Sequence, residues 1–580
     1  MPEDQHPMTI CGLVNKGLAG YSGLTSSVKR DGKWIDTTAE DFVTGLYAFA
    51  AGLYDLGVRK GDRVALHAEN STEWLIIDQA LLRIGAVTVP IYTTQPVDQI
   101  RHIVNDAKVR GYIVSTSDLF SSCPPDLGSV PSMDWMLGIF GRHADGMLTY
   151  EEVLVRGHKC LANDPGLVSR CESEIRGEDL ATLSYTSGTT GVPKGVMLTH
   201  ANIATNVVAL MERLPFEPPC TMLSYLPLSH SLERLATILY LYMSCPIYFV
   251  ENFLEIADDL KTVRPVHMTT VPRLLEKVHS GIMNKAEEAT GLKGKLARWA
   301  FGRANRYNLT NPDQGLAHRL ADKLVYSKVR DRVFGGNLQV LTSGGAALSP
   351  AVQSFINALG IICGQGYGLT ETAPVISLYE EADLRPGSVG RPIRDVEVKI
   401  ADDGEILARG PNIMRGYYNM PEETAAVMSK GGWFHTGDIG TLKDGHIYIT
   451  DRKKQLFKLS TGKYVAPTPI EVALAENPLI EHAVVLGEDR KFCGALIVPD
   501  RQGVMQQFGG DLSPQELHNQ LEAAIAAANE GRPPWEQIKK FSLVSESFTI
   551  DTGELTPTMK VRRKVVYKKY RNLIDELYSQ

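Results

Sequence analysis

Between residues 38 and 130 the hydrophobic positions alternate between helical spacing and strand spacing. Apolar residues recur at helical intervals over 39–56 and 74–84, whereas 63–67, 85–90 and 111–115 are short strand-like runs. Strands separated by helices predict a parallel sheet with helices packed on its faces. The same alternation returns between residues 200 and 380, with further strands predicted at 222–225, 246–250, 267–271 and 339–343.

Beyond residue 385 the pattern changes to short strands separated by Gly and Asp turns, at 396–400, 405–409 and 446–450. Residues 470–475, 483–487 and 495–499 then follow as helix, strand and strand. We therefore predict an α/β protein whose large N-terminal domain, residues 1–452, contains parallel α/β sheets and a small β-rich subdomain at about 385–450. A small, mobile α+β domain is expected over 453–580, with the boundary near 451–454.

Composition narrows the class of protein. The 580 residues predict roughly three to four domain-sized units, and 43% hydrophobic with 22% charged residues is typical of a soluble globular protein. A net charge of −7 argues against nucleic acid as a partner, since binding it requires a basic surface. The eight cysteines include no C-x-x-C pair, so neither a zinc site nor redox chemistry is indicated. A disulfide framework is not expected in so large a chain, and a reducing, cytoplasmic location is predicted.

Targeting and membrane signals are weak in the sequence. The N-terminus lacks the basic and apolar regions of a signal peptide. The longest apolar stretch, 235–250, is interrupted by Ser244 and Pro246 and is shorter than the roughly 20 residues that cross a bilayer. We predict that this stretch is core, and that Cys245 and Cys363 are buried small apolar residues.

The run YTSGTTGVPKG at 185–195 is typical of a loop that wraps a polyphosphate. Glycines let backbone N–H groups approach phosphate oxygens, and hydroxyls and an ammonium complete the contacts. The run is not a Walker A loop, because Pro193 precedes Lys194 and Gly195 follows it. A flexible surface loop is the alternative. The candidate ligand-binding residues are Thr186, Ser187, Gly188, Thr189, Thr190 and Lys194.

A second motif, GYGLTET at 366–372, follows the glycine segment LTSGGAAL at 341–348. Glycines beside Tyr367 could form a flat slot in which a purine stacks on the ring. Glu371 offers a hard oxygen ligand of the kind that Mg²⁺ prefers. An ordinary turn with an exposed tyrosine is the alternative.

Three further motifs lie in the C-terminal third. In WFHTGDIG at 433–440, Asp438 in a tight Thr-Gly turn could accept hydrogen bonds from ribose hydroxyls, with an Asx-turn cap as the alternative. Arg452 and Lys454 lie at the expected domain boundary, where Arg452 could donate to ribose or phosphate and Lys454 could be a pivot. In LTPTMKVRR at 555–563, Lys560 follows a Pro-Thr turn and could reach a distant active site, although a basic tail is usually a solvated face.

These five motifs, in this order and over most of the chain, resemble those of the adenylate-forming superfamily of acyl-CoA synthetases, luciferases and peptide-synthetase adenylation domains. The segments 226–234, 271–275, 451–459 and 555–560 resemble more closely the AMP-forming long-chain fatty acyl-CoA synthetases.

The resemblance implies specific roles for the motif residues. The 185–195 loop would hold the β- and γ-phosphates of ATP, with Thr186 and Glu371 near Mg²⁺. The other nucleotide contacts would come from Gly344, Gly345, Gly366 and Tyr367 at adenine, Thr370 at the α-phosphate, and Asp438 and Arg452 at the ribose.

The resemblance also implies roles in the acyl and thiol chemistry. Lys560 would bridge the acyl carboxylate and the α-phosphate, Lys454 would be the hinge, and Gly462 would lie where coenzyme A passes. His230 would lie at the mouth of an acyl tunnel near the carboxylate. For His230 a hydrogen-bonded core histidine is the alternative.

The implied reaction is activation of a long-chain fatty acid to acyl-AMP with ATP and Mg²⁺, then transfer to coenzyme A. One alternative is an acyl-AMP ligase that loads a carrier protein. A catalytically silent nucleotide- or lipid-binding protein is another, and the intact Thr186, Lys194, Glu371, Asp438 and Lys560 count against it. Chain-length preference and the existence of a homodimer stay open.

Residues 292–307 form a basic amphipathic candidate helix. Leu292, Leu296, Trp299 and Ala300 fall at helical spacing among Lys and Arg residues, a pattern that could rest on an anionic membrane. A surface helix that packs on the domain is the favoured alternative. Peripheral membrane contact is therefore a hypothesis.

Overall fold

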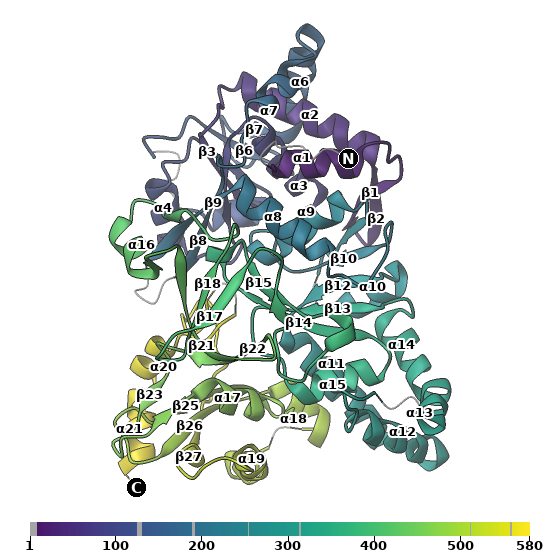
Figure 1. The fold of residues 1–580 in the computed structure, drawn as a ribbon, viewed down its shortest axis with the longest axis vertical. Helices are drawn as coiled ribbons and strands as arrows, with labels where there is room; N and C mark the ends of the chain where they lie inside the picture. The colour runs from purple at the N-terminus through teal and green to yellow at the C-terminus, as the bar shows by residue number, and fades with distance from the viewer. Residues whose placement is uncertain are drawn as a thin grey trace.

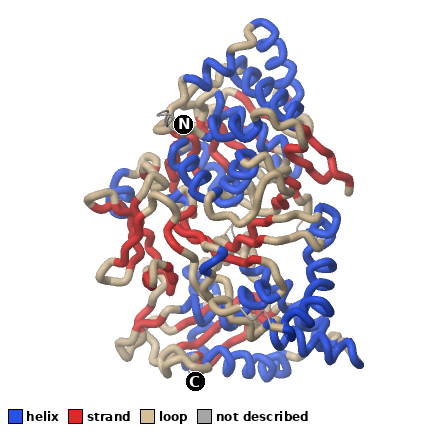
Figure 2. Tube along the Cα trace, turned by 45° about the vertical axis from the view of Figure 1, so that its right-hand side comes forward, coloured by secondary structure: helices blue, strands red, loops and turns tan. Residues whose placement is uncertain are grey.

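The computed structural model describes residues 8–124, 130–187, 192–252, 255–312, 315–510, 512–556 and 559–579. Within these ranges a large α/β body fills the top, centre and right of Figure 1, and the C-terminal elements form a smaller body at the lower left. The α/β class predicted from the sequence is confirmed. Helices and strands are interleaved throughout both bodies (Figure 2).

A first sheet, nine-stranded among the described residues, runs through the centre of the large body. Its middle strands from β14 to β1 are parallel, whereas β15, β16 and β2 are antiparallel to their neighbours. In spatial order the strands are β16 (Arg391–Pro392), β15 (Val375–Leu378), β14 (Ile362–Gly368), β13 (Val340–Ser343), β12 (His267–Thr270), β10 (Met222–Ser224), β11 (Ile247–Phe249), β1 (Leu24–Arg30) and β2 (Lys33–Thr38).

The second sheet of the large body has eight strands in the described ranges. Strands from β8 to β7 are parallel, and β9 and β19 continue the sheet antiparallel at one edge. The spatial order is β19 (Gly416–Tyr417), β9 (Pro193–Thr199), β8 (Leu180–Ser187), β4 (Val87–Ile91), β3 (Arg63–His67), β5 (Gly111–Val114), β6 (Trp135–Gly138) and β7 (Leu148–Thr149).

The antiparallel edge strands correct the prediction of parallel sheets, because both sheets are mixed. Strands β8 and β9 are joined by the short glycine run, and β1 and β2 by a two-residue connection. Short connections allow only antiparallel pairing, because a parallel pair needs a crossover of a dozen or more residues.

A layer of helices separates the two sheets in Figure 1: α1 (Ile10–Leu18), α3 (Thr72–Arg83), α8 (His200–Met211) and α9 (Ser231–Tyr242). A buried ion pair of 2.6 Å joins Arg234 of α9 to Asp78 of α3. The apolar stretch 235–250 forms most of α9 and β11, and Leu235 and Ile247 are buried, so its assignment to the core is confirmed. Cys245 and Cys363 are buried as predicted.

Further helices cover the outer faces of the large body. The second sheet carries α2 (Ala39–Asp55) and α6 (Tyr150–Asn163), which pack closely on each other. The lower right of Figure 1 holds α11 (Pro272–Glu288), α12 (Gly291–Ala304), α13 (Leu316–Ala321), a π-helical turn (Asp322–Tyr326), α14 (Ser327–Phe334) and α15 (Pro350–Ala358). The remaining helices are α4 (Val97–Asp106), α5 (Ser117–Ser121), α7 (Leu167–Ser173), α10 (Ile256–Val263) and α16 (Pro421–Val427).

The β-rich region predicted after residue 385 is an antiparallel sheet. Its strands are β17 (Glu397–Ile400), β18 (Glu405–Arg409), β21 (Trp433–Lys443), β20 (Met428–Ser429) and β22 (His446–Arg452). Phe434, Ile406 and Ile447 join the hydrophobic core of the large body. The last residue of β22, Arg452, lies where the sequence predicts the domain boundary, which stays a prediction.

The smaller body begins with the hairpin β23 (Phe457–Lys458) and β24 (Tyr464–Val465). Its sheet has the order β25 (Ile480–Leu486), β26 (Cys493–Pro499) and β27 (Ile538–Leu543). Alternate strand residues face opposite sides, so Val485 packs in one core and Val484 in the other. The helices are α17 (Pro467–Ala475), α18 (Arg501–Phe508), α19 (Pro514–Asn529), α20 (Arg563–Lys569) and α21 (Arg571–Ser579). Within the described ranges, no helix combines the length and the apolar content that crossing a bilayer requires.

Candidate functional site

The glycine run at 185–195 spans the end of β8, the connection to β9 and the start of β9. Thr186 pairs with Lys194 across the ladder, and both are half-buried. Below them the ring of Tyr185 lies against Gly195, where a Cβ atom would approach the ring within 3.0 Å. A side chain at 195 would therefore crowd the Tyr185 ring, and glycine avoids this contact. Three predicted residues of the loop, Gly188, Thr189 and Thr190, and the side chain of Ser187 lie outside what the structure describes.

Tyr417 of β19 links the hairpin to the second motif. Its hydroxyl donates to Oε1 of Glu371 at 2.9 Å, and Nζ of Lys194 lies 5.1 Å from the centroid of its ring. Burial, and then the charge of Glu371, raise the pKa of Tyr417, so the phenol stays a donor at neutral pH. The sequence analysis did not identify Tyr417. Its only sequence signal is the GYY run at 416–418, which carries no pattern specific for ligand binding.

Glu371 lies in a short 3-10 turn (Thr370–Thr372) that follows β14. Its carboxylate and the hydroxyl of Thr186 are hard oxygen donors, and Mg²⁺ is usually bound by one or two carboxylates together with phosphate oxygens. The donor set therefore fits the predicted ion.

The carboxyl ends of β13 and β14 meet the N-terminus of α9. A Cβ atom on Gly344 would lie 2.9 Å from Cδ2 of Leu232, so glycine permits the close approach, and Gly345 has φ +81°. The hydroxyls of Thr370 and Ser231 lie 3.5 Å apart. Gly366 is part of β14 itself. In open α/β sheets this edge is where ligands bind, and the N-terminus of a helix favours anions.

His230 is the N-cap residue of α9. Its Nδ1 atom accepts a hydrogen bond of 3.2 Å from the backbone N–H of Leu232. Removal from water, and then the positive charge of Lys560, lower the pKa of His230 to about 4. The side chain is therefore neutral at pH 7. The capping bond agrees with the alternative in which His230 is a hydrogen-bonded structural residue. The position of His230 near an acyl carboxylate stays a prediction.

Asp438 is held between Tyr367 and Arg452. The Tyr367 hydroxyl donates to Oδ2 of Asp438 at 2.8 Å, and Nε of Arg452, its cross-strand neighbour, lies 3.3 Å from Oδ1. Asp438 is 5% exposed, and burial raises the pKa of its carboxyl although Arg452 opposes the shift. Tyr367 is buried as well, which excludes the alternative of an exposed tyrosine.

The expected tight turn around Asp438 is wrong. Thr436 and Gly437 lie inside the long strand β21, where Gly437 with φ +72° makes a kink instead of a reversal. The backbone N–H of Asp438 donates to Oγ1 of Thr436 at 3.1 Å, and the strand continues to Lys443. The kink turns the Asp438 side chain toward Tyr367 while preserving the strand pairing with Arg452.

Lys560 comes from the C-terminal body and joins the residues of the large one. Its pKa is lowered to about 8, first by removal from water and then by the charge of Arg452, while Asp438 and Glu371 oppose the shift. Lys560 keeps solvent-accessible surface, while the surrounding groups of the large body reduce the hydration of its ammonium. Backbone bonds of the turn hold it: Thr556 N–H donates to Lys560 O at 2.8 Å, and Lys560 N–H to Oγ1 of Thr556 at 3.0 Å.

We define the charged cluster as Glu371, Asp438, Arg452 and Lys560. Two carboxylates and two cations from both bodies thus share one region, beside the N-terminus of α9. Such a region can accept a nucleotide, because its donors and acceptors match phosphate and ribose, and it can stabilise negative charge that develops between them.

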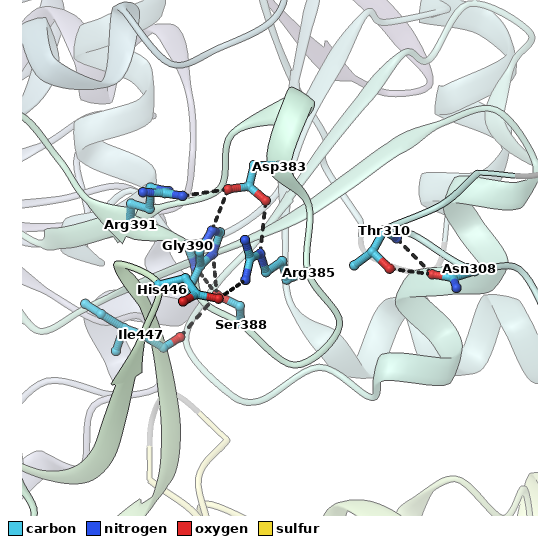
Figure 3. Close-up of polar contacts among 10 residues, drawn as sticks. Asn308, Thr310, Asp383, Arg385, Ser388, Gly390, Arg391, His446 and Ile447 are labelled. Carbon is cyan, nitrogen blue, oxygen red and sulfur yellow. Dashed lines mark hydrogen bonds and ion pairs between the residues drawn. The ribbon is translucent and has the colours of Figure 1, made fainter.

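The strand that carries Arg452 is anchored at its other end by the network drawn in Figure 3. We define the anchoring network as Asp383, Arg385, Ser388, Arg391 and His446. Asp383 Oδ2 accepts from Arg391 Nη2 and His446 Nε2, both at 2.8 Å, and Oδ1 accepts from Arg385 Nε at 3.0 Å. The Oγ atom of Ser388 lies 3.2 Å from His446 Nδ1. His446 and Ser388 are buried, so this Ser-His-Asp set has no access for a substrate and fixes the start of β22.

Two further predicted residues come from the chain that follows β22. Lys454 follows β22 at the passage into the C-terminal body. Gly462, with φ +87°, is in the exposed turn between β23 and β24. The roles of Lys454 as a hinge and of Gly462 beside coenzyme A stay predictions.

Two family models match the chain. One, described as an AMP-binding enzyme, covers residues 21–418, and the other, described as an AMP-binding enzyme C-terminal domain, covers residues 454–580. A long-chain-fatty-acid–CoA ligase, FadD15 of Mycobacterium bovis, is 35% identical over 95% of this chain and 93% of its own length. A chloroplastic long-chain-fatty-acid–[acyl-carrier-protein] ligase, AEE15 of Arabidopsis thaliana, is 30% identical over 92% of this chain and 81% of its own.

Solved structures agree in fold. The crystal structure of the adenylation domain of a carboxylate reductase from Mycobacterium chelonae superposes with a TM-score of 0.78, covering 100% of this chain and 92% of that one at 22% identity. At that level of identity the likeness concerns the fold alone.

Proposed function

We propose a function that follows from one premise: the chain belongs to the AMP-binding enzyme family. The protein activates a long-chain fatty acid with ATP to give acyl-AMP and pyrophosphate, then transfers the acyl group to coenzyme A and releases AMP. The similarity to the Mycobacterium bovis ligase over nearly the whole chain supports coenzyme A as the acceptor. The observation that carries the proposal is the position of Lys560, a cation of the C-terminal body, among Asp438, Arg452 and Glu371 of the large body.

In the first half-reaction a carboxylate oxygen of the fatty acid attacks the α-phosphorus of ATP, and pyrophosphate leaves. Lys560 neutralises negative charge that grows on the oxygens around that phosphorus. Asp438 and Arg452 hold the ribose, and Lys194 with the hairpin loop binds the outer phosphates. Glu371 and Thr186 would hold Mg²⁺, which would supply further positive charge against the phosphates.

The intermediate is a mixed anhydride that water would hydrolyse, so the site must exclude water until the thiol arrives. We propose that the C-terminal domain then rotates about Lys454, which withdraws Lys560 and brings the turn at Gly462 toward the site. The thiolate of coenzyme A attacks the acyl carbon, and AMP departs with the electrons of the broken acyl–oxygen bond.

The direct test supplies purified protein with Mg²⁺, ATP and palmitate, with either coenzyme A or a holo-acyl-carrier protein. We expect AMP and palmitoyl-CoA in equal amounts and little loading of the carrier. Preferential loading of the carrier would instead establish the alternative suggested by the Arabidopsis relative. Absence of acid-dependent pyrophosphate release would identify a silent binding protein. A series of saturated acids of increasing length, assayed in the same way, defines the chain-length preference.

The pivot is tested separately by Lys454→Pro. Proline fixes φ and removes a backbone donor, so it should block rotation. We expect acyl-AMP to form and remain bound while thioester formation falls by about a hundredfold or more, the scale of loss when a catalytic group is misplaced. Lys458→Pro, four residues further on in β23, is the matched control for a proline in this region. Equal loss of both half-reactions in Lys454→Pro would contradict the pivot.

Peripheral contact with a membrane belongs to the same proposal, because a long-chain acid partitions into lipid. A homodimer is a separate proposal, checked by the molar mass of the full chain in solution. Light scattering that gives a mass close to 63.7 kDa would exclude it.

A further inference from the structure

The two most exposed large hydrophobic residues of the described chain lie on neighbouring helices. Leu292 of α12 is 86% exposed and Leu316 of α13 is 84% exposed, more than any other large apolar side chain in the described ranges. Trp299 and Leu320, on the same two helices, are 38% and 50% exposed. The helices are neighbours at the lower right of Figure 1, at the edge of the molecule.

The outward apolar positions follow the helical repeat. On α12, Leu292, Lys295 and Trp299 are three and four residues apart and so lie on one face. The opposite face, with Ala300, Phe301 and Ala304, is buried against α11 and α15.

This separation corrects the stripe expected from the sequence. Ala300 belongs to the buried face and does not lie with Leu292 and Trp299. The packing of the helix on the domain, which was the favoured alternative, is thus confirmed for one face only.

The short helix α13 repeats the arrangement. Leu316, Arg319 and Leu320 are three and four residues apart, and all three are exposed. The sequence analysis did not predict α13, and its exposed leucines are unusual because an amphipathic helix normally buries its apolar face.

The same segment is strongly basic. Residues 291–334 contain ten Lys or Arg and three Asp, a net charge of +7, in a chain whose total is −7. Lys293, Lys295, Arg306, Arg319 and Lys323 are exposed. Leucine and tryptophan side chains surrounded by cations are the composition of segments that lie in the headgroup region of anionic membranes.

We propose that the α12–α13 surface, formed by Leu292, Lys295, Trp299, Leu316, Arg319 and Leu320, docks the protein on a lipid bilayer that carries anionic headgroups. The apolar side chains enter the boundary between headgroups and acyl chains, and the cations contact lipid phosphates. The positive charge of this segment favours a bilayer over a second copy of the chain as the binding partner. A second copy of the chain would bring +7 against +7, which is repulsive, whereas an anionic bilayer is complementary.

The role of this surface rests on the proposed function, because an enzyme bound to the bilayer is close to the fatty acid that partitions into the lipid. Binding itself is measured without ATP, fatty acid or coenzyme A. Failure to bind vesicles and failure to make acyl-CoA are therefore separate results.

The experiment is flotation of the full chain with vesicles of phosphatidylcholine alone or mixed with phosphatidylglycerol. We expect flotation with the mixed vesicles only, weakened by added salt. The double variant Leu292→Asp/Leu316→Asp should bind at least tenfold more weakly, because each buried leucine contributes about a factor of ten to partitioning. Val155→Asp, at a 54% exposed valine on α6, is the matched control and should float like the parent chain.

A second variant separates charge from apolar contact. Lys295→Glu/Arg319→Glu should abolish the preference for phosphatidylglycerol while the melting temperature stays unchanged, since both side chains are exposed. Three results would overturn the proposal: no flotation of the parent chain, equal flotation of parent and leucine variant, or a dimer in solution that the leucine variant converts to a monomer. The last result would make the surface a contact between copies.

Discussion

The charged cluster and the anchoring network each pair an aspartate with arginine, yet the pKa values of the two aspartates shift in opposite directions. Asp383 has two guanidinium groups and an imidazole within 3.0 Å, and these partners hold the pKa of its carboxyl well below the usual range. Asp438 has one guanidinium at 3.3 Å and a neutral phenol, so burial dominates and raises its pKa.

The comparison teaches how to separate a structural set from a ligand-binding one. In the anchoring network the charged forms are stabilised by protein partners, and both ring nitrogens of His446 are bonded (Figure 3). In the charged cluster both Asp438 and Lys560 are shifted toward their neutral forms. When the protein compensates the charge of a side chain only in part, a charged ligand can supply the missing partner.

Lys560→Ala breaks the charged cluster most strongly. We expect acid-dependent pyrophosphate release to fall by about 10²–10³-fold, the usual cost of removing one stabilising group from a transition state. Thioester formation from supplied acyl-AMP should be largely retained, because Lys560 acts only in the first step. Lys564→Ala, an exposed lysine of α20, is the control. Equal loss in both half-reactions would contradict the assignment.

Paired amide substitutions test the contrast between the two aspartates. Asp438→Asn should raise the KM for ATP by about 10- to 100-fold, since a hydrogen bond to a charged group is worth about 1.5–3 kcal/mol, with little change in melting temperature. Asp383→Asn should destabilise the fold by about 1–3 kcal/mol, because buried His446 loses its charged partner, while the KM stays unchanged. Reversed phenotypes would refute the comparison.

Tyr417→Phe sharpens the comparison within the charged cluster. Loss of the hydroxyl removes a donor to Glu371 but preserves the ring beside Lys194. We expect about a tenfold rise in the Mg²⁺ concentration needed for half-maximal activity, the effect of roughly one hydrogen bond to a charged group. Titration of activity with Mg²⁺ at saturating ATP gives the value. A change in melting temperature without a change in the Mg²⁺ requirement would leave Tyr417 with a purely structural role.

The pH dependence of adenylation is expected to show a small effect that is specific to Lys560. Lys560 loses its proton near pH 8 in the free enzyme, so kcat/KM for adenylation should decline above about pH 8. Bound phosphates favour the charged lysine, which moves the decline in kcat to higher pH. A decline in kcat/KM that persists unchanged in Lys560→Arg would belong to another group.

The contribution of the anchoring network to stability should depend on pH in the acid range. The folded-state pKa of Asp383 is lowered, so its contribution to stability is complete above the unfolded pKa of about 3.9 and is lost as pH falls below it. Thermal melting between neutral and acid pH should therefore show a loss that Asp383→Asn reduces. An identical acid limb in the variant would contradict this role.

The helices and strands were largely predictable from local pattern. Residues 63–67 and 405–409 are strands with the expected limits, and the helix expected over 39–56 is Ala39–Asp55. Apolar periodicity fixes such elements because each side chain faces core or solvent according to a repeat of 2.0 or 3.6 residues. The antiparallel edges were missed, since pairing direction depends on which strands become neighbours.

The sequence by itself determined which residues carry the candidate chemistry, because phosphate, ribose and carboxylate recognition require glycines, hydroxyls, acids and lysines in short runs. It did not determine what those residues touch. Tyr417 meets Glu371 across 46 positions and Tyr367 meets Asp438 across 71, contacts that no local repeat encodes. Only the tertiary structure brought Lys560 to the large body and left Leu316 in water, since proximity and exposure arise from the packing of distant elements.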